Sequence, residues 1–268
     1  MFDGVSYNKG GGILHMLRNY LGDDAFFAGL SDYLKTNEYG TGEAHQLRLS
    51  LEKVSGKDLN WFFNQWYFGK GYPKLEVKST FDPMKKQVTI NVAQTQEEKF
   101  EFPLSIDVLE NGKISRKEVW VTAKAKNDFV FDVTKNPELI NANPEGLLLS
   151  DIKQDKTPEQ LYLQYTTAKD LYSKYTAIEE AKDQVSKNPF ADKLYAAALK
   201  DKFYRNRLLA LEGLPEDPKS FLADVEKLAQ NDEKNLVKGA AIGVLAKTKN
   251  PKYLPLFEKG INAVSNSV

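Results

Sequence analysis

The sequence predicts a multidomain α+β protein in which an antiparallel β-sandwich lies between two helical segments. Changes in hydrophobic period support this prediction. Apolar residues recur at helical spacing up to residue 72, alternate with a period of two from Lys74, and return to helical spacing after Pro158. We therefore expect three domains, at 1–72, 73–153 and 154–268, the last of them truncated.

The first segment is expected to contain four helices. Gly22 ends the first, and Asp23 or Asp24 is expected to cap the second. A third helix is expected from Glu43 to Val54, and Asp58 is expected to cap a short aromatic fourth helix. Helical spacing predicts a buried face in each, and a ligand-stacking surface is the less favoured alternative for the aromatic one. The residues concerned are Phe26, Phe27, Leu30 and Leu34, then Leu47, Leu51 and Val54, then Trp61, Phe62, Phe63 and Trp66.

The middle segment is expected to be a stack of strands without a functional site of its own. Asn111-Gly112, between the third and fourth expected strands, is typical of a two-residue hairpin turn. Five to seven short strands at this spacing predict a small antiparallel sandwich over about residues 74–152. The alternating runs are 75–78, 88–92, 104–108, 119–121 and 129–133.

The third segment is expected to be helical throughout. Pro158 marks a helix start, an apolar stripe from Leu161 to Ile178 predicts a long amphipathic helix, and Asn188-Pro189 interrupts it. The stretches 207–221 and 238–254 then correspond at an offset of about 31 to 33 residues, each with a Pro-marked turn, which resembles a HEAT-like repeat. The stripe consists of Leu161, Tyr165, Ala168, Tyr172, Tyr175 and Ile178; its tyrosines are expected to pack helices, with a peptide-accepting concavity as the alternative.

Composition excludes several classes of function. The 37 basic and 37 acidic residues cancel, so no overall field attracts nucleic acid or an anionic membrane. Cysteine is absent, which excludes disulfides and thiolate metal sites, and no apolar run approaches a transmembrane span. Met1–Gly4 lacks the basic and apolar regions of a signal peptide, so an envelope or periplasmic location would require a signal peptide on a longer parent chain.

A short motif near the start of the chain carries the functional argument. Tyr7-Asn8-Lys9-Gly10 precedes an amphipathic stretch that ends at Leu21-Gly22. It resembles the Tyr-x-Lys-Gly element of zinc aminopeptidases of the aminopeptidase N-like (gluzincin) family. The order of later residues is similar to that family over nearly the whole chain, most specifically over residues 2–77. The similar positions include Ile13, Leu14, Met16, Leu17, Phe26, Leu59, Phe62, Phe63, Gln65, Trp66, Gly71, Tyr72 and Pro73.

The resemblance implies that residues 1–72 are the C-terminal helical part of a metallopeptidase catalytic domain. It implies that Tyr7 is catalytic, because a neutral phenol aimed at the carbonyl oxygen stabilises the charge that develops there in the transition state. Lys9 and Gly10 are given structural roles: Lys9 is expected to pair with a carboxylate, and Gly10 to allow a close backbone approach. The alternative is that Tyr7 only packs where the helix begins.

The zinc-binding part of the family pattern is absent from this sequence. The family's Gly-x-Met-Glu-Asn and His-Glu-x-x-His motifs would precede Tyr7, and neither occurs here. The chain has only His15 and His45, and neither has a second histidine three or four residues away. We expect a polar or interface-facing His15, a surface His45, and no metal ligand in this chain. Zinc, the water that it activates and the general-base glutamate are expected in the missing portion of the parent enzyme.

The leading hypothesis is a C-terminal fragment of a zinc aminopeptidase that removes N-terminal residues from peptides, inactive without its N-terminal catalytic portion. The alternative is a non-catalytic scaffold that binds a peptide or protein through the helical repeats. Other catalysis finds no support, since neither a cysteine nucleophile nor a Ser/His/acid arrangement is present. A phosphate-binding role for Gly10-Gly11-Gly12 is disfavoured because no strand precedes it.

Overall fold

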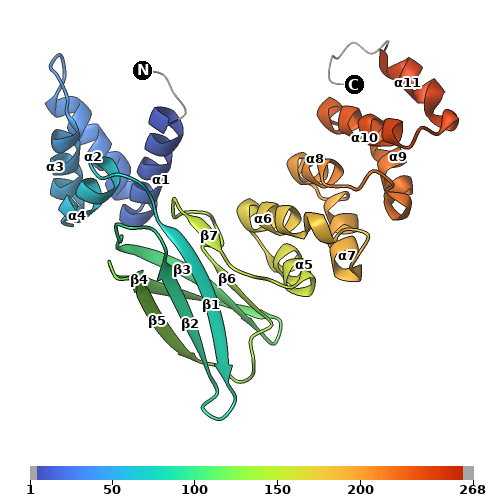
Figure 1. The fold of residues 1–268 in the computed structure, drawn as a ribbon. Coiled ribbons are helices and arrows are strands. Elements are labelled where there is room, and N and C mark those ends of the chain that lie inside the picture. Colours follow the sequence, from blue (N-terminus) through green and yellow to red (C-terminus); the bar gives the residue numbers. More distant parts are fainter. Residues whose placement is uncertain (1–4, 262–268) are drawn as a thin grey trace. The chain divides into compact units, whose positions relative to one another are not determined.

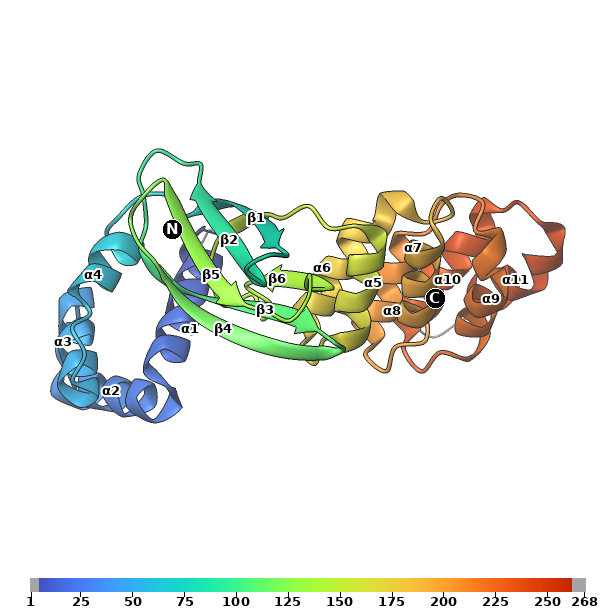
Figure 2. The ribbon, with the colours of Figure 1, turned by 90° about the horizontal axis from the view of Figure 1, so that it is seen from below.

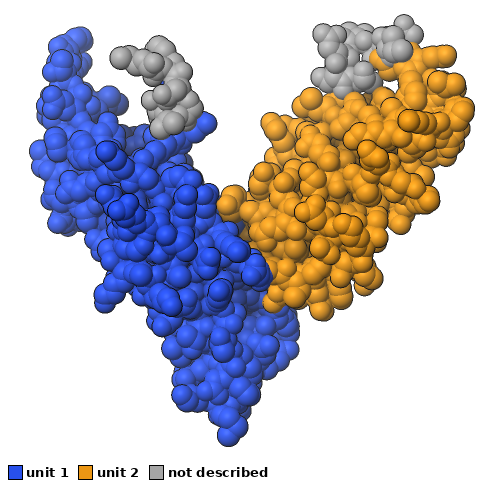
Figure 3. Space-filling view, viewed as in Figure 1, with its two compact units in different colours: residues 1–155 blue, residues 156–268 orange. Residues whose placement is uncertain are grey.

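A computed structural model describes residues 5–261, apart from the side chains of Val5, Ser6, Lys259 and Ile261. The chain divides into two compact units, Met1–Asp155 and Lys156–Val268, coloured blue and orange in Figure 3. The signal-peptide prediction for Met1–Gly4 and the truncation inferred at Asn266–Val268 lie outside the described residues. Within 5–261, no helix has both the length and the apolar character needed to cross a bilayer.

The first unit begins with helices, as the apolar spacing predicts. A π-helical turn leads directly into the first α-helix, and the second and third helices lie side by side (Figures 1 and 2). The elements are η1 Val5–Lys9, α1 Gly10–Leu21, α2 Asp23–Thr36, α3 Ala44–Ser55, α4 Asn60–Phe62 and η2 Phe63–Tyr67.

The predicted cap of α2 is wrong, and the N-cap of α4 is Leu59, which has no side-chain capping hydrogen bond, so the predicted Asp58 cap lies one residue early. Asp23 is the first residue of α2, and its carboxylate pairs with Arg18 at 2.7 Å instead of accepting a helix N–H. The two helices are separated by a single residue, Gly22, which leaves no room for a side-chain cap. The Asp58 carboxylate accepts the backbone N–H of Asn60 at 2.8 Å, where α4 begins.

Three of the predicted interior residues are exposed. Phe27 and Leu34 of α2 are 52% and 67% exposed, and Val54 of α3 also lies at the surface. Phe26 and Leu51 are buried as predicted. The helices α2 and α3 pack mainly on each other, and each covers only one narrow face of its partner, so apolar residues outside that face stay exposed. The Arg18 guanidinium lies 5.1 Å from the centroid of the Phe27 ring, which gives this exposed aromatic a polar neighbour.

Two sheets follow the helices in the same unit. The four-stranded sheet has the order β5-β2-β1-β7 and the three-stranded sheet the order β4-β3-β6. All pairings are antiparallel except β1 with β7, where Lys74 lies beside Asp151; the expectation of a wholly antiparallel arrangement is therefore wrong at this edge. The strands are β1 Lys74–Asp82, β2 Gln87–Gln94, β3 Phe102–Glu110, β4 Lys113–Val121, β5 Lys126–Asp132, β6 Leu139–Ala142 and β7 Asp151–Lys153.

Turn chemistry and alternation agree with the sequence-based predictions here. Asn111 and Gly112 join β3 to β4 with φ angles of 53° and 71°, the left-handed pair that a two-residue hairpin requires. Along β2, Val88, Ile90 and Val92 are buried while their neighbours are partly exposed. The short strands β6 and β7 were not predicted, because four and three residues are too few to show a period.

One hydrophobic cluster joins the helices and both sheets of the first unit. It contains residues from α1, the aromatic helix and strands β1, β2, β3, β4 and β6. The Gln154 side chain protects the free edge of β6, since it donates to the Ile140 carbonyl at 2.8 Å and accepts from the Ala142 N–H at 3.2 Å. This shared core fixes the end of α1 against the strands, which is where a pocket forms.

The second unit is helical as predicted, but one of its predicted helices is wrong. The long helix expected from Leu161 to Ile178 is two helices, separated at Ala168 and restarted by an Asp170 cap that accepts the Ser173 N–H at 2.6 Å. Tyr172 and Tyr175 therefore lie exposed on the second of them. The helices are α5 Pro158–Thr167, α6 Leu171–Ala181, η3 Lys182–Gln184, α7 Pro189–Ala198, α8 Tyr204–Glu212, η4 Lys219–Phe221, α9 Leu222–Asn231, α10 Asn235–Lys247, η5 Pro251–Tyr253 and α11 Leu254–Ile261.

The two corresponding stretches both form a helix, a Pro-marked turn and a second helix. The first is α8, η4 and α9, and the second is α10, η5 and α11. A buried ion pair connects them: Arg207 donates two hydrogen bonds to Asp232, at 2.7 and 2.9 Å, and a further one to the Asp201 carbonyl at 2.8 Å. Both charged side chains are almost fully buried, so the pair fixes how α8 meets the α9–α10 connection.

Candidate functional site

Tyr7 lies on the π-helical turn η1, which continues into α1 without a break. Lys9, the residue before α1, keeps helical backbone angles, so the motif and the helix form one continuous element. The Tyr7 side chain is 63% exposed. The structure therefore presents the phenol at the surface of the described chain.

The neighbouring motif residues have few contacts inside the chain. Within residues 5–261, Lys9 makes no ion pair, so its expected carboxylate partner is not found there. A Cβ atom placed on Gly10 would meet no atom within 4 Å, and the same holds for Gly11. No close backbone approach within the described residues requires glycine at position 10, and the structural role expected for Gly10 stays a prediction.

The described residues do not fit a zinc site. No group of three or more His, Asp or Glu side chains among residues 5–261 could hold a metal ion. Both histidines are exposed, as expected. His15 Nε2 lies 3.3 Å from the Asn19 side-chain nitrogen, and the His45 ring stacks on Phe68 with centroids 4.8 Å apart. Neither imidazole has the three-ligand environment that a catalytic zinc requires.

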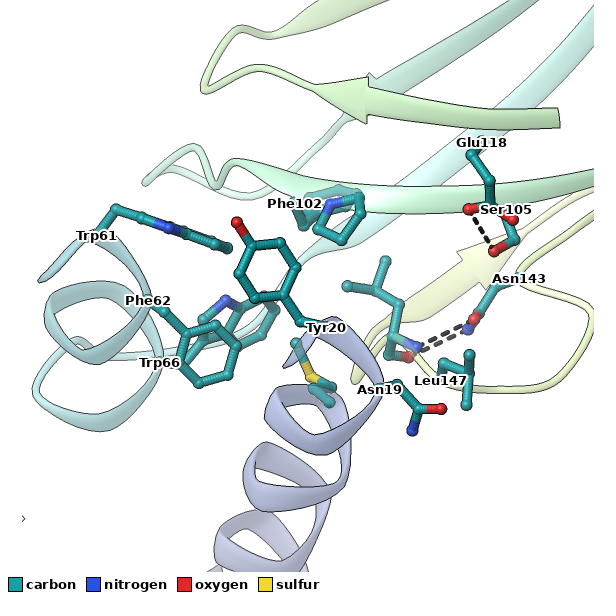
Figure 4. A pocket seen from close by; sticks show the side chains of 13 residues that line it. Asn19, Tyr20, Trp61, Phe62, Trp66, Phe102, Ser105, Glu118, Asn143 and Leu147 are labelled. Atoms are coloured by element: carbon teal, nitrogen blue, oxygen red, sulfur yellow. Dashed lines mark hydrogen bonds between the residues drawn. The ribbon is translucent and has the colours of Figure 1, made fainter. Parts of the chain in front are cut away.

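A cavity of about 220 Å³ opens in the first unit, at the end of α1 opposite to Tyr7. Figure 4 shows aromatic side chains gathered at one end of it and the polar side chains of Ser105, Glu118 and Asn143 at the other. The thirteen lining residues are Met16, Asn19, Tyr20, Trp61, Phe62, Trp66, Phe102, Pro103, Ser105, Glu118, Asn143, Leu147 and Leu148.

The aromatic end of the cavity is built by the predicted core residues. Phe62 and Trp66 are buried as expected, and the Trp66 indole nitrogen is buried without a hydrogen-bond acceptor. Trp61 is only partly buried, with its ring edge-to-face against Tyr20 at 5.6 Å. The Lys57 ammonium covers the Tyr20 ring at 4.3 Å, so this aromatic end already attracts one cation from within the chain.

The polar end of the cavity depends on a tight loop after β6. Asn143 takes a left-handed backbone conformation, with a φ of 52°. Its side chain holds Leu148 twice, accepting the backbone N–H at 3.0 Å and donating to the carbonyl at 3.1 Å. Ser105 Oγ donates to the Glu118 carboxylate at 2.8 Å across β3 and β4. Glu118 and Asn143 were not predicted from the sequence, in which only the Asn-Ala-Asn-Pro composition at 141–144 marks the loop.

The second unit contains a cluster of ionisable groups around Asp201. Its carboxylate accepts hydrogen bonds from Tyr165 Oη at 2.6 Å and Lys174 Nζ at 2.8 Å. Burial by itself would raise the pKa of Asp201, but these hydrogen bonds outweigh it and hold the pKa at about 2. Burial, and then the Asp201 carboxylate, raise the pKa of Tyr165 far above its ordinary value. The cluster joins α5 and α6 to the connection between α7 and α8, and we interpret it as structural.

Comparison with known proteins identifies the family that the first segment resembles. Residues 1–66 match the Peptidase family M1 domain. The tricorn protease-interacting factor F2 of Thermoplasma volcanium is 42% identical over 77 residues, which are 29% of this chain and 10% of that protein. An aminopeptidase N of Lactococcus lactis subsp. lactis is 29% identical over 165 residues, 58% of this chain and 19% of that protein. A leucyl aminopeptidase of Saccharolobus solfataricus is 28% identical over 152 residues, 54% of this chain and 18% of that protein.

A solved structure extends the likeness in fold to almost the whole chain. The crystal structure of Legionella pneumophila aminopeptidase A in complex with aspartic acid matches with a TM-score of 0.77 at 17% identity. The match covers 96% of this chain and 37% of that one. The chain thus spans less than a fifth of the curated relatives described above. These matches confirm the resemblance to aminopeptidase N-like metallopeptidases, and the mixed fold of helices and two sheets is similar to that of aminopeptidase A.

Proposed function

We propose that this chain is the C-terminal portion of a zinc-dependent aminopeptidase that removes N-terminal residues from peptides. The observation that carries the proposal is the match of residues 1–66 to the M1 peptidase domain, because this stretch contains Tyr7 and its motif. The proposed organisation is the end of a catalytic domain at 1–72, a β-sandwich spacer at 73–153, and a HEAT-like repeat domain at 154–268. The repeats would shape the access of peptides.

In this proposal Tyr7 stabilises the oxyanion that forms when the scissile peptide carbonyl is attacked. A neutral phenol remains a donor at neutral pH, and a donor aimed at the developing negative charge lowers the barrier more than it lowers the energy of the bound substrate. The exposure of the Tyr7 side chain supports this role, since a phenol buried in its own chain could not reach a substrate. Lys9 and Gly10 would support the turn that presents it.

The described residues supply no zinc ligands, so we derive no metal-dependent step from this chain. In the proposal, the metal, the attacking water and the general base belong to a preceding catalytic portion. The chain alone is therefore proposed to be inactive, and its partners are that catalytic portion and the peptide substrate.

The first test is the mass of the native protein in its source cells, detected with an antibody against this chain. The 268 residues have a mass of 30.3 kDa. A much larger native species would support the proposal, and a species of the chain's own mass would remove the catalytic portion on which it depends.

In the larger protein, Tyr7→Phe should lower kcat by about 10²–10³-fold, as removal of other oxyanion donors does. Tyr39→Phe, at another exposed tyrosine, is the matched control and should leave kcat as it is. An unchanged kcat in the Tyr7 variant would exclude Tyr7 from the mechanism.

A non-catalytic scaffold is the alternative function. The exposed apolar side chains of Leu171, Tyr172 and Tyr175 on α6 favour it, because such side chains suit a peptide or protein partner. A native protein with the mass of this chain alone that binds peptides without cleaving them would support this alternative.

A further inference from the structure

The cavity at the end of α1 has an unusual charge balance. Of its thirteen lining residues, Glu118 is the only one with a carboxylate, ammonium or guanidinium side chain. The Glu118 carboxylate accepts the Ser105 hydroxyl, but no Lys or Arg of the described chain lies within ion-pair distance of it. The cavity therefore offers one carboxylate that has no cationic partner in residues 5–261.

The other polar groups at this end already make hydrogen bonds within the chain. The Ser105 hydroxyl is committed to Glu118, and the Asn143 amide nitrogen donates to the Leu148 carbonyl. The Asn19 amide nitrogen donates to the His15 carbonyl at 2.8 Å. The Glu118 carboxylate is thus the one negatively charged group that this end offers to a ligand, and it suits a hydrogen-bond donor that carries a positive charge.

The remainder of the cavity limits what can carry that charge. Phe62, Trp66 and Phe102 form an apolar wall opposite to Glu118 (Figure 4). A volume of about 220 Å³ is below the ~300–1,000 Å³ typical of sites for drug-sized ligands, so only a small group fits. The combination favours one aromatic or branched apolar stem with one cationic end.

We propose that this cavity is a binding site for a small primary amine on an aromatic stem, with the ammonium group against Glu118 and the stem against the aromatic wall. The site is separate from the proposed catalytic residue. Tyr7 and Tyr20 lie thirteen residues apart along one helical element, which is roughly 20 Å at 1.5 Å per residue. The proposal therefore adds a second site and does not rest on the proposed function.

Isothermal titration calorimetry of the 268-residue chain at pH 7 tests the site with two matched probes. 2-Phenylethylamine carries the cation, and 2-phenylethanol is its neutral counterpart of nearly the same shape. We expect saturable binding of the amine and roughly fivefold weaker binding of the alcohol, the upper end of what an ion pair at an exposed carboxylate contributes. Glu118→Gln should reduce amine binding to the level of the alcohol and leave alcohol binding unchanged.

Glu98→Gln is the control variant, because Glu98 is an exposed carboxylate of the same unit that does not line the cavity. It should bind the amine as the unchanged chain does, and far-UV circular dichroism should show both variants folded. Equal binding of amine and alcohol by the unchanged chain would overturn the proposal without any variant. A Glu118→Gln variant that still prefers the amine would also overturn the proposal. Failure of the unchanged chain to bind the amine and the alcohol saturably would overturn it as well.

Discussion

The packing of α2 against α3 depends on a glycine at their closest contact. A Cβ atom placed on Gly29 would lie 2.6 Å from Leu51 Cδ2 and 3.1 Å from the Leu51 Cα atom. Leu51 is fully buried, and its backbone belongs to α3, so it cannot turn aside as an exposed side chain would. Ordinary contacts of a Cβ atom begin at about 3.4 Å. Gly29→Ala must therefore push the two helices apart by several tenths of an ångström.

Two opposing effects set the size of the change in the free energy of unfolding. Overpacking of a well-packed contact costs about 1–3 kcal/mol. Alanine is favoured over glycine inside a helix by about 1 kcal/mol, which offsets part of that cost. We expect Gly29→Ala to lower the free energy of unfolding by up to about 2 kcal/mol. Gly11→Ala is the matched control in the same unit, since a Cβ atom on Gly11 would meet no atom within 4 Å. It should raise stability by up to about 1 kcal/mol.

Urea denaturation followed by tryptophan fluorescence isolates this effect. All three tryptophans, Trp61, Trp66 and Trp120, lie in the first unit, so the signal reports the unfolding of that unit alone. Gly29→Ala should shift the midpoint to lower urea, and Gly11→Ala should shift it to equal or higher urea. A Gly29→Ala variant as stable as Gly11→Ala would show that the α2–α3 contact relaxes freely and would refute the argument.

Two further predictions concern the second unit and can be checked by thermal denaturation. Arg207→Met should destabilise it by about 3–5 kcal/mol because Asp232 is left buried without its cation, and Arg207→Met combined with Asp232→Leu should recover most of that loss. Asp201, held by Lys174 and Tyr165, has a pKa of about 2 against 3.8 unperturbed. Its contribution, about 2 kcal/mol, is complete above pH 4 and lost as the pH falls through 2. Asp201→Asn should therefore flatten the stability profile between pH 4 and 2, and an unchanged slope would contradict this.

Local signals predicted the secondary structure well where a period or a turn residue was present. The alternation around Ile90 and the Asn111-Gly112 hairpin both correspond to observed elements, because strand period and left-handed turn geometry are properties of neighbouring residues. The break at Ala168 was missed because its stripe of apolar residues continues across it. A change of helix direction need not interrupt such a stripe.

In the candidate site, too, a residue in a local sequence motif could be predicted and residues brought together only by folding could not. The exposed Tyr7 was found because its motif is contiguous in sequence, and its catalytic role stays a proposal. Glu118 and Asn143 could not be found, since neither belongs to a motif and each gains meaning only from distant neighbours. The residues of α1 and the aromatic helix that complete the cavity lie far from both in the chain.

The sequence by itself determined most of the helices and the longer strands, the hairpin turn, and the family that the first segment resembles. These follow from residue spacing, turn chemistry and a contiguous motif, all of which act over a few residues. Only the tertiary structure decided that Phe27 and Leu34 stay exposed, that β7 runs parallel to β1, and that a carboxylate with no cationic partner in residues 5–261 faces an aromatic wall. Burial and charge pairing depend on which distant elements come into contact, and no local pattern records that.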